Sequence, residues 1–449
     1  MSQVCRYWRA ALLLDTKSWS FISTEFIELL PLFLERSGSH PLEINLTTET
    51  LLSRTIRDIG PHMGRVGVLR CDLEEADTVA LRILSKLDRS PNLRTFSFKI
   101  NRPPAVAPEV MDAALVLGEM PALRNLELLP FPATPRFAGC KHLVDLRLDV
   151  RYSTLTGVLD LLSANPSLER VKLLGNFEDN QDTRATGTIS MKRLRFFAVE
   201  RCTPCTFLEK LNFLGKARVF IRHNFIPHLA PFAYTLPQSM GTYPNLQGLS
   251  SLYVLTTVHP NNTYVEATGP NGSIAIQYTD LQHGSTLSNT IATLPTTGVT
   301  RLTCESHPAI TEIEIEKVVG LMEFLPCLEE VTLVHFGSAD IQIFLSALSN
   351  SSGWVNLRRL KFVHCGQVED WIGHLVTVAM GREDDNLRLD TVTIVFEEGE
   401  GVEQFGALVG FVGKLGLVEE GAGQILRSEH VWDDANCTTT RVSVPMWDD

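Results

Sequence analysis

Long apolar runs free of charge are missing from this chain of 449 residues. The longest stretch without lysine, arginine, aspartate or glutamate covers residues 223–265, and five prolines and four asparagines interrupt it. A helix broken in this way cannot cross a bilayer, because proline removes backbone hydrogen bonds that hydrocarbon cannot replace. We therefore expect no membrane-spanning helix and no membrane partner.

Cysteine is sparse and odd in number, with nine residues spread along the chain. A small secreted domain held by disulfides would carry a dense and even set. The first residues also lack the apolar core and cleavage site of a secretory signal peptide. These features predict a reducing compartment, the cytoplasm or the nucleus.

Basic residues are scarce in the second half of the chain. Residues 1–250 hold 30 Lys and Arg against 25 Asp and Glu, whereas residues 251–449 hold 10 against 27. With a net charge of −12 the chain is a poor ligand for phosphates, so no nucleic-acid partner is expected. The acidic half is interpreted either as a solvated surface or as a surface that attracts a basic partner.

Local signatures of catalysis and of metal or cofactor binding are also missing. The sequence contains no HExxH pair, no GxxxxGK[ST] phosphate loop and no GxSxG motif. Cys202 and Cys205 have the spacing of half a zinc site, but no second pair accompanies them. We expect no enzyme activity, no metal and no cofactor. A hydrolase whose site is assembled near residues 223–300 is the alternative.

The chain does contain a short recurring pattern, in which apolar residues stand at the first, fourth and sixth positions. Its clear copies begin at Leu93, Leu123, Leu143, Leu168, Leu194, Leu328, Leu357 and Leu389. Consecutive copies lie 20 to 32 residues apart, apart from the gap between the fifth and the sixth. This period is typical of leucine-rich repeats, in which each unit supplies a short strand and a returning helix.

The physical basis of this pattern is burial by stacking. The last two apolar positions are two residues apart and therefore share one face of a strand. Helical spacing follows at residues 79–87 and 155–162. One unit cannot bury its apolar face alone, so neighbouring units must stack. The sequence predicts an α/β solenoid of about ten irregular leucine-rich repeats, with a curved parallel sheet and outer helices.

Residues 223–300 depart from the repeat and are rich in Pro, Thr, Asn and Gly. Residues 263–267 and 273–278 alternate apolar and polar side chains, and a Gly-Pro-Asn-Gly turn separates them. This arrangement predicts a β-hairpin within a β-rich insertion. In the acidic, Gly-rich tail that starts at residue 397, we expect one helix at about 402–415.

A motif at the start of the chain carries a resemblance. Val4, Trp8 and Leu12 share one face of a predicted helix. The set of residues Val4, Cys5, Trp8, Arg9 and Trp19 resembles the C-terminal half of an F-box. Residues 33–44 resemble the segment that joins the F-box to leucine-rich repeats in fungal proteins.

This resemblance implies a non-catalytic substrate-recognition subunit of a Skp–cullin–F-box ubiquitin ligase. Its partners would be a Skp-type adaptor with its cullin ligase and a target protein, and the five motif residues would contact the adaptor. The family's opening Leu-Pro helix has no counterpart here, so we expect a partial F-box. A leucine-rich-repeat scaffold for protein interactions, without any link to a ligase, is the alternative.

The expected organisation follows from the repeat and the resemblance together. It comprises a partial F-box at 1–24, repeats at 25–222, a β-rich insertion or irregular repeats at 223–300, further repeats at 301–396, and an acidic cap and tail at 397–449. Side chains between the apolar strand positions would point away from the core and bind the target protein. The residues predicted for this surface are Arg147, Lys172, Arg195, Thr332 and Lys361.

Overall fold

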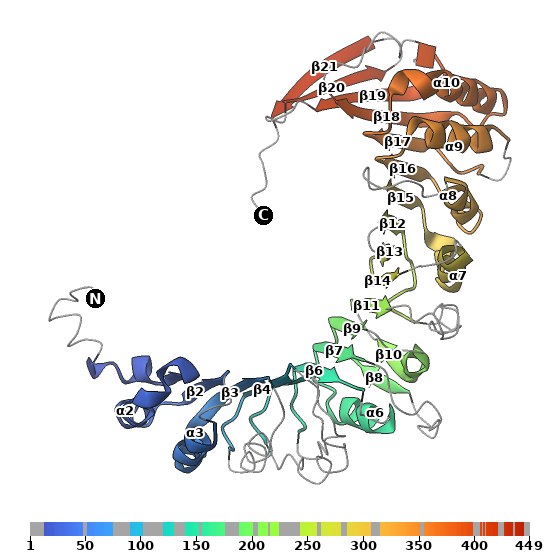
Figure 1. Cartoon of the computed structure of the whole chain (residues 1–449). Coiled ribbons are helices and arrows are strands. Elements are labelled where there is room, and N and C mark those ends of the chain that lie inside the picture. Colours follow the sequence, from blue (N-terminus) through green and yellow to red (C-terminus); the bar gives the residue numbers. More distant parts are fainter. Residues whose placement is uncertain are drawn as a thin grey trace. The chain divides into compact units, whose positions relative to one another are not determined.

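The computed structural model forms two compact units, Met1–Ala217 and Arg218–Asp449, which we call the first and the second unit (Figure 1). Each unit is a sheet of mostly parallel strands accompanied by helices, so the chain is an α/β protein. The structure describes residues 13–47, 52–74, 90–101, 120–129, 140–151, 155–175, 188–200, 205–213, 216–223, 243–257, 262–279, 285–306, 315–350, 354–397, 405, 407–408, 410–420, 426–433 and 436–443.

The sheet of the first unit is parallel throughout its described strands, which follow one another in chain order. Its strands are β1 (Phe21–Ser23), β2 (Leu42–Leu46), β3 (Val66–Leu73), β4 (Thr95–Ile100), β5 (Asn125–Leu129), β6 (Asp145–Asp149), β7 (Arg170–Leu174) and β9 (Phe196–Glu200). A separate parallel pair joins β8 (Ile189–Met191) to β10 (Leu211–Phe213). The helices are η1 (Thr16–Trp19), η2 (Thr24–Leu29), α2 (Leu30–Arg36), α3 (Leu52–Ile59), η3 (Gly60–Arg65), α6 (Leu155–Ala164) and η5 (Cys205–Lys210).

Strand register explains how the apolar pattern is buried in the first unit. Leu126, Leu146 and Val171 are register partners on successive strands, and each is at most 2 % exposed. The leading leucines of two pattern copies, Leu143 and Leu168, are also fully buried. Equivalent apolar residues thus stack from strand to strand, which removes from water a face that a single strand would leave exposed.

Helix α6 confirms the helix predicted at residues 155–162 and extends it to Ala164. Its apolar face buries Leu155, Val158 and Leu162. Asn165 and Pro166 follow it, and proline cannot continue a helix. The described helices α2, α3 and α6 lie on one face of the sheet (Figure 1). The helix predicted at residues 79–87 lies outside the described residues.

The second unit combines parallel and antiparallel pairing. Its strands are β11 (Arg218–His223), β12 (Ser251–Thr257), β13 (Asn262–Gly269), β14 (Gly272–Thr279), β15 (Arg301–Ser306), β16 (Glu330–Val334), β17 (Arg359–Val363), β18 (Leu389–Glu397), β19 (Val412–Glu420), β20 (Leu426–Asp433) and β21 (Asn436–Ser443). From β12 through β15 to β19 the neighbours are parallel, and β20 and β21 add antiparallel pairs.

Helices of the second unit lie on one face of its sheet (Figure 1). They are α7 (Ser285–Thr293), η8 (Thr296–Gly298), α8 (Ile315–Met322), α9 (Ser338–Asn350) and α10 (Val368–Asp384). Consecutive helices from α7 to α10 pack against each other. None of the helices in the described part of the chain is long and apolar enough to span a membrane.

The predicted β-hairpin is confirmed as β13 and β14, which pair antiparallel across a tight turn. The hairpin continues the sheet, because β14 pairs with β11 on one side and β13 pairs with β12 on the other. Gly269 is required at the turn, since a Cβ atom there would lie 3.0 Å from Leu249 Cα and nearer still to the Gly248 carbonyl oxygen. The hairpin therefore supplies two strands to the same sheet as β11 and β12.

The helix predicted at about 402–415 is wrong for its last four residues, which begin β19. Leu415 and Leu417 are buried, whereas Lys414 is exposed and Gly416 is partly exposed, so burial alternates with the period of a strand. Gly413 permits close pairing with β18, because a Cβ atom would lie 2.8 Å from the Asp390 carbonyl oxygen. The alternation of buried and exposed side chains in β19 favours a strand more strongly than the weak helical spacing of the preceding residues favours a helix.

Candidate protein-binding surfaces

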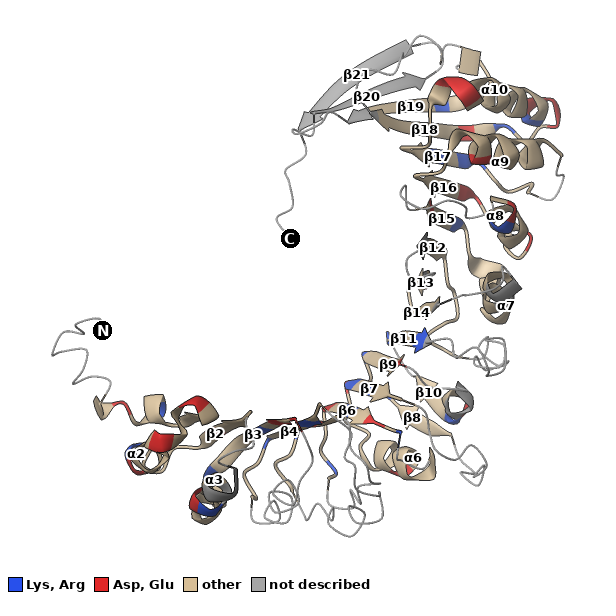
Figure 2. Cartoon of the chain, in the orientation of Figure 1, with Lys and Arg blue, Asp and Glu red and all other residues tan. Residues whose placement is uncertain are grey.

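The exposed face of the first sheet carries a row of polar side chains that we call the first row. Register places Arg70, Ser97, Glu127, Arg147 and Lys172 beside one another on strands β3 to β7. Neighbouring strands lie about 4.8 Å apart, so consecutive members can touch. Both signs of charge occur along these strands (Figure 2).

Glu127 is the centre of the first row. Its carboxylate accepts a hydrogen bond from Ser97 Oγ at 2.6 Å and from Arg147 Nη1 at 2.8 Å. Lys99 Nζ lies 3.6 Å from the same carboxylate. Next to this group, Lys172 Nζ lies 2.5 Å from Glu200 Oε1. Because such partly exposed pairs contribute only roughly 0.2–1 kcal/mol each, a partner protein could exchange them at little cost.

Two of the predicted surface residues, Arg147 and Lys172, are register partners in the first row. The expected strand position is wrong for Arg195, which precedes β9 and is not a strand residue. The register partner of Lys172 on β9 is Ala198, whose side chain is buried. Arg195 is 80 % exposed and lies 4.0 Å from Glu169, so it belongs to the rim of the sheet.

A second row crosses the second unit. Tyr253, Thr303, Thr332, Lys361 and Thr393 are register partners on β12, β15, β16, β17 and β18. All five side chains are partly exposed. The predicted residues Thr332 and Lys361 are therefore adjacent, on the face that their strand positions indicated.

A third row lies two residues further along the same strands. It consists of Leu255, Glu305, Val334, Val363 and Val395. Leu255, Glu305, Val334 and Val363 are partly exposed, while Val395 is buried. After the acidic Glu305, the remaining members of the third row, Val334, Val363 and Val395, are all apolar.

Two tyrosines flank the acidic end of the third row. Tyr253 Oη donates a hydrogen bond to Glu305 Oε2 at 2.6 Å, and Tyr264 Oη donates one to Glu266 Oε2 at 2.8 Å. The two rings meet edge to face with centroids 6.1 Å apart. Partial burial, followed by the hydrogen bond to a carboxylate, raises the pKa of both phenols. Each tyrosine thus stays a neutral donor that fixes the position of one carboxylate.

Two histidines stand at the ends of the next strands. His335 and His364 follow β16 and β17 with φ of 60° and 50°, and their rings stack with centroids 5.7 Å apart. His335 Nδ1 lies 4.0 Å from Glu305 Oε1. The left-handed backbone turns the chain from each strand toward the following helix. Tyrosine, carboxylate and imidazole groups therefore follow one another along this edge of the sheet.

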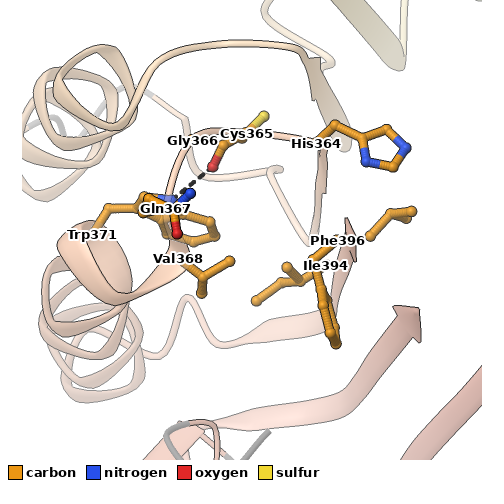
Figure 3. Close-up of a pocket in the computed structure, with 9 residues that line it drawn as sticks. His364, Cys365, Gly366, Gln367, Val368, Trp371, Ile394 and Phe396 are labelled. Atoms are coloured by element: carbon orange, nitrogen blue, oxygen red, sulfur yellow. Dashed lines mark hydrogen bonds between the residues drawn. The ribbon is translucent and has the colours of Figure 1, made fainter. Parts of the chain in front are cut away.

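A cavity of about 200 Å³ lies next to His364, between the start of α10 and the end of β18 (Figure 3). His364 and Gln367 line it together with the apolar residues Val368, Ile394 and Phe396. Trp371 forms part of the wall and donates a hydrogen bond from Nε1 to the Cys365 carbonyl oxygen at 2.9 Å.

The two cysteines next to these surfaces, Cys304 and Cys365, are buried. Burial raises the pKa of the Cys365 thiol to about 11 and that of Cys304 to about 12, so both remain protonated near neutrality. Among the described residues, no group of three or more His, Cys, Asp or Glu side chains could hold a metal ion.

The N-terminal motif is described only at its end. Val4, Cys5, Trp8 and Arg9 lie outside the described residues. Trp19 closes η1, where its ring packs edge to face against Phe33 with centroids 5.2 Å apart. The guanidinium carbon of Arg36 lies 4.6 Å from the Trp19 centroid, which is a cation–π contact. Trp19 therefore joins the predicted F-box remnant to α2.

Sequence reasoning missed the pair formed by Tyr253 and Glu305. Fifty-two positions separate the two residues, and the hairpin β13–β14 intervenes between their strands in the chain. The available signal was the strand alternation itself, since Tyr253 and Glu305 occupy polar-face positions of two weak copies of the apolar pattern, at Leu249 and Val299.

No protein-family model matches this chain, and no curated protein matches its sequence. Function is therefore inferred from the residues, contacts and register described above.

Proposed function

We propose that the chain is a non-catalytic protein-recognition subunit built as an irregular leucine-rich-repeat solenoid. The observation that carries this proposal is the first row, which crosses five parallel strands. Arg70, Glu127, Arg147 and Lys172 are at least partly exposed in it, while Ser97 is buried and donates to Glu127. A row of mixed polar groups on a rigid sheet suits recognition of a protein surface, because register fixes the spacing of its members.

The repeat interpretation is supported by the positions that the pattern singles out. Leu328, Val331 and Leu333 are buried, as are their counterparts one unit later. After the strand, Cys365 occupies the Asn or Cys position of a leucine-rich repeat, and its Sγ donates to the Leu333 carbonyl oxygen at 3.3 Å. A buried side chain that satisfies a backbone group of the preceding strand is what stacking of repeats requires.

We further propose that the recognised protein is a substrate for ubiquitination. The support is the N-terminal motif, in which Val4, Cys5, Trp8, Arg9 and Trp19 resemble half of an F-box. In this proposal the motif contacts a Skp-type adaptor of a cullin ligase, and the exposed rows bring the target close to it. A protein-interaction scaffold that has no ligase association is the second candidate, favoured if the adaptor does not bind.

Co-purification of the full chain with a Skp-type adaptor tests the proposal. We expect the adaptor to be retained by the wild-type chain, and Trp8→Ala to weaken its binding by about 30-fold or more, because buried tryptophans dominate interface energies. The affinity is measured by titration of labelled adaptor. Phe324→Ala, at a partly exposed aromatic of the second unit, is the control and should bind as the wild type does.

Two outcomes would contradict the ligase assignment. Absence of adaptor binding by the wild-type chain would leave the scaffold candidate as the better one. Unchanged binding by Trp8→Ala would show that the residues resembling an F-box have no part in the contact.

A further inference from the structure

The acidic end of the third row has the composition of a binding site for a cationic side chain. We call Tyr253, Leu255, Tyr264, Glu266 and Glu305 the Tyr–Glu patch, which lies on β12, β13 and β15 of the second unit. Register brings Leu255 directly between Tyr264 and Glu305. Aromatic faces next to carboxylates attract guanidinium and ammonium groups through cation–π and charge-assisted contacts.

Charge within the patch is unevenly compensated. Arg218 Nη2 lies 3.2 Å from Glu266 Oε1, so this carboxylate already has a cationic partner. Glu305 is 33 % exposed, and its described partners are the Tyr253 hydroxyl and His335, with no lysine or arginine among the described residues. The surrounding sequence is strongly acidic, with 27 Asp and Glu against 10 Lys and Arg in residues 251–449. The patch is thus complementary to a basic group.

The same row offers an apolar contact beyond its acidic end. Val334 and Val363 continue from Glu305 on the next two strands, and both are partly exposed. Val395 follows on β18 in the wall of the cavity shown in Figure 3. An apolar side chain can therefore bury its surface three strands away from Glu305.

The spacing between strands sets the distance that a ligand must cover between Glu305 and Val395. Three strand spacings of about 4.8 Å place Glu305 about 14 Å from Val395. An extended peptide advances about 3.3 Å per residue, so about four residues cover this distance. One short segment can therefore reach both places when it crosses the strands.

We propose that this surface binds an extended segment of a partner protein, in which an arginine or lysine contacts the Tyr–Glu patch and an apolar residue about four positions away enters the cavity at Val395. This inference rests on the proposed function, because it names the class of partner that the second unit recognises. The basic group would pair with Glu305 beside the Tyr253 and Tyr264 rings. Val334 and Val363 would contact the residues in between.

Selection from a random peptide library tests the inference without a known target. Displayed twelve-residue peptides are selected on the immobilised full-length chain, and enriched sequences are synthesised with a fluorescent label. We expect enrichment of a basic residue and an apolar residue about four positions apart. Replacing the arginine by citrulline or the apolar residue by serine should each weaken binding about tenfold or more, as measured by fluorescence anisotropy.

Variants of the chain locate the site. Glu305→Gln keeps an acceptor for the Tyr253 hydroxyl and removes only the charge, and we expect about tenfold weaker binding of the enriched peptides. Glu329→Gln is the matched control, because Glu329 directly precedes β16, is 49 % exposed and already pairs with Arg359. The control should bind as the wild type does.

The inference is overturned if no peptide is enriched, if the enriched peptides lack a basic residue, or if Glu305→Gln binds them as tightly as the wild type. Failure of the proposed ligase function is read out separately, by the adaptor titration. Adaptor binding without peptide enrichment would reject only the peptide site, and peptide enrichment without adaptor binding would reject only the ligase assignment.

Discussion

Replacing Trp371 by alanine is expected to destabilise the second unit by about 3–5 kcal/mol, because it removes the largest fully buried side chain of the described residues. The indole packs against Phe362, with ring centroids 4.9 Å apart. Its loss also leaves the carbonyl oxygen of Cys365 without the donor that Trp371 Nε1 supplies at 2.9 Å. A cavity and an unsatisfied buried acceptor thus act in the same direction.

Urea unfolding and hydrogen exchange measured by mass spectrometry give the size and the place of this effect. Because the chain has two units, the denaturation curve alone does not say which of them unfolds, whereas exchange assigns the loss to peptides of β17, β18 and α10. Faster exchange confined to the first unit, or a change in unfolding free energy below about 1 kcal/mol, would contradict the prediction.

Two control variants separate packing from hydrogen bonding at this site. Trp371→Phe keeps an aromatic ring and loses the Nε1 donor, so we expect a smaller cost of about 1–3 kcal/mol. Met380→Ala alters the same helix at a side chain that is 46 % exposed, and should change stability by less than about 0.5 kcal/mol. Equal effects of all three variants would mean that the helix, and not the indole, determines the result.

The cavity at the start of α10 depends on the same tryptophan. Trp371 supplies part of its wall, and its hydrogen bond fixes the Cys365 carbonyl within the turn that leads from β17 into the helix. Gly366 in this turn has φ of 47°, and a Cβ atom there would lie 3.0 Å from Ser338 Cα and closer to its backbone nitrogen. A glycine and a buried indole together maintain the shape of a surface that we propose binds a peptide.

Local periodicity was enough to predict much of the sheet. The hairpin β13–β14 was predictable because alternation on both sides of Gly-Pro-Asn-Gly has one geometric solution, a tight antiparallel turn. The burial of Leu126, Leu146 and Leu360 was predictable because side chains two positions apart share a face of a strand. In both cases the information lies within about ten residues of sequence.

Features set by pairing over long distances were not predictable from the same information. Arg195 was placed on the binding surface because it stands between apolar residues, yet β9 begins one residue later and Ala198 holds the equivalent position. In the acidic tail, pairing with β18 places residues 412–415 in strand β19, although a helix had been predicted to extend to 415. At β19, pairing with a distant strand decides the structure, and a short window of sequence does not contain that pairing. Arg195 is a different case, because the pattern position of Arg147 and Lys172 already falls on Ala198 in the copy that begins at Leu194.

In the candidate site, too, some residues were predictable from local sequence and others were not. Thr332 and Lys361 could be recognised from the strand pattern alone, and they are register partners on the exposed face. Tyr253 and Glu305 become neighbours only because β12 pairs with β15 after the hairpin has been inserted into the sheet. Their hydrogen bond gives the surface a specific chemistry, whereas the predicted residues indicate only where the surface lies.

Replacing Asn165 by alanine is expected to destabilise the first unit by about 2–4 kcal/mol, although no core packing is lost. Asn165 is fully buried after the end of α6. Its Nδ2 donates to the Leu161 carbonyl oxygen at 2.9 Å, and its Oδ1 accepts from the Leu143 backbone nitrogen at 3.1 Å. Alanine leaves both backbone groups buried without a partner, at a cost of about 1–3 kcal/mol for each.

A matched control distinguishes burial from the hydrogen bond as such. Asn92 Nδ2 makes a similar bond to the Gly64 carbonyl oxygen at 2.7 Å, but it is exposed, so water can replace the amide in Asn92→Ala. We expect that variant to lose less than about 1 kcal/mol. Urea unfolding gives the two costs, and exchange should rise at the start of β6 only in Asn165→Ala. Equal costs for the two variants would contradict the idea that the buried Asn165 side chain, by bonding the Leu143 backbone, holds the end of α6 against the segment that leads into β6.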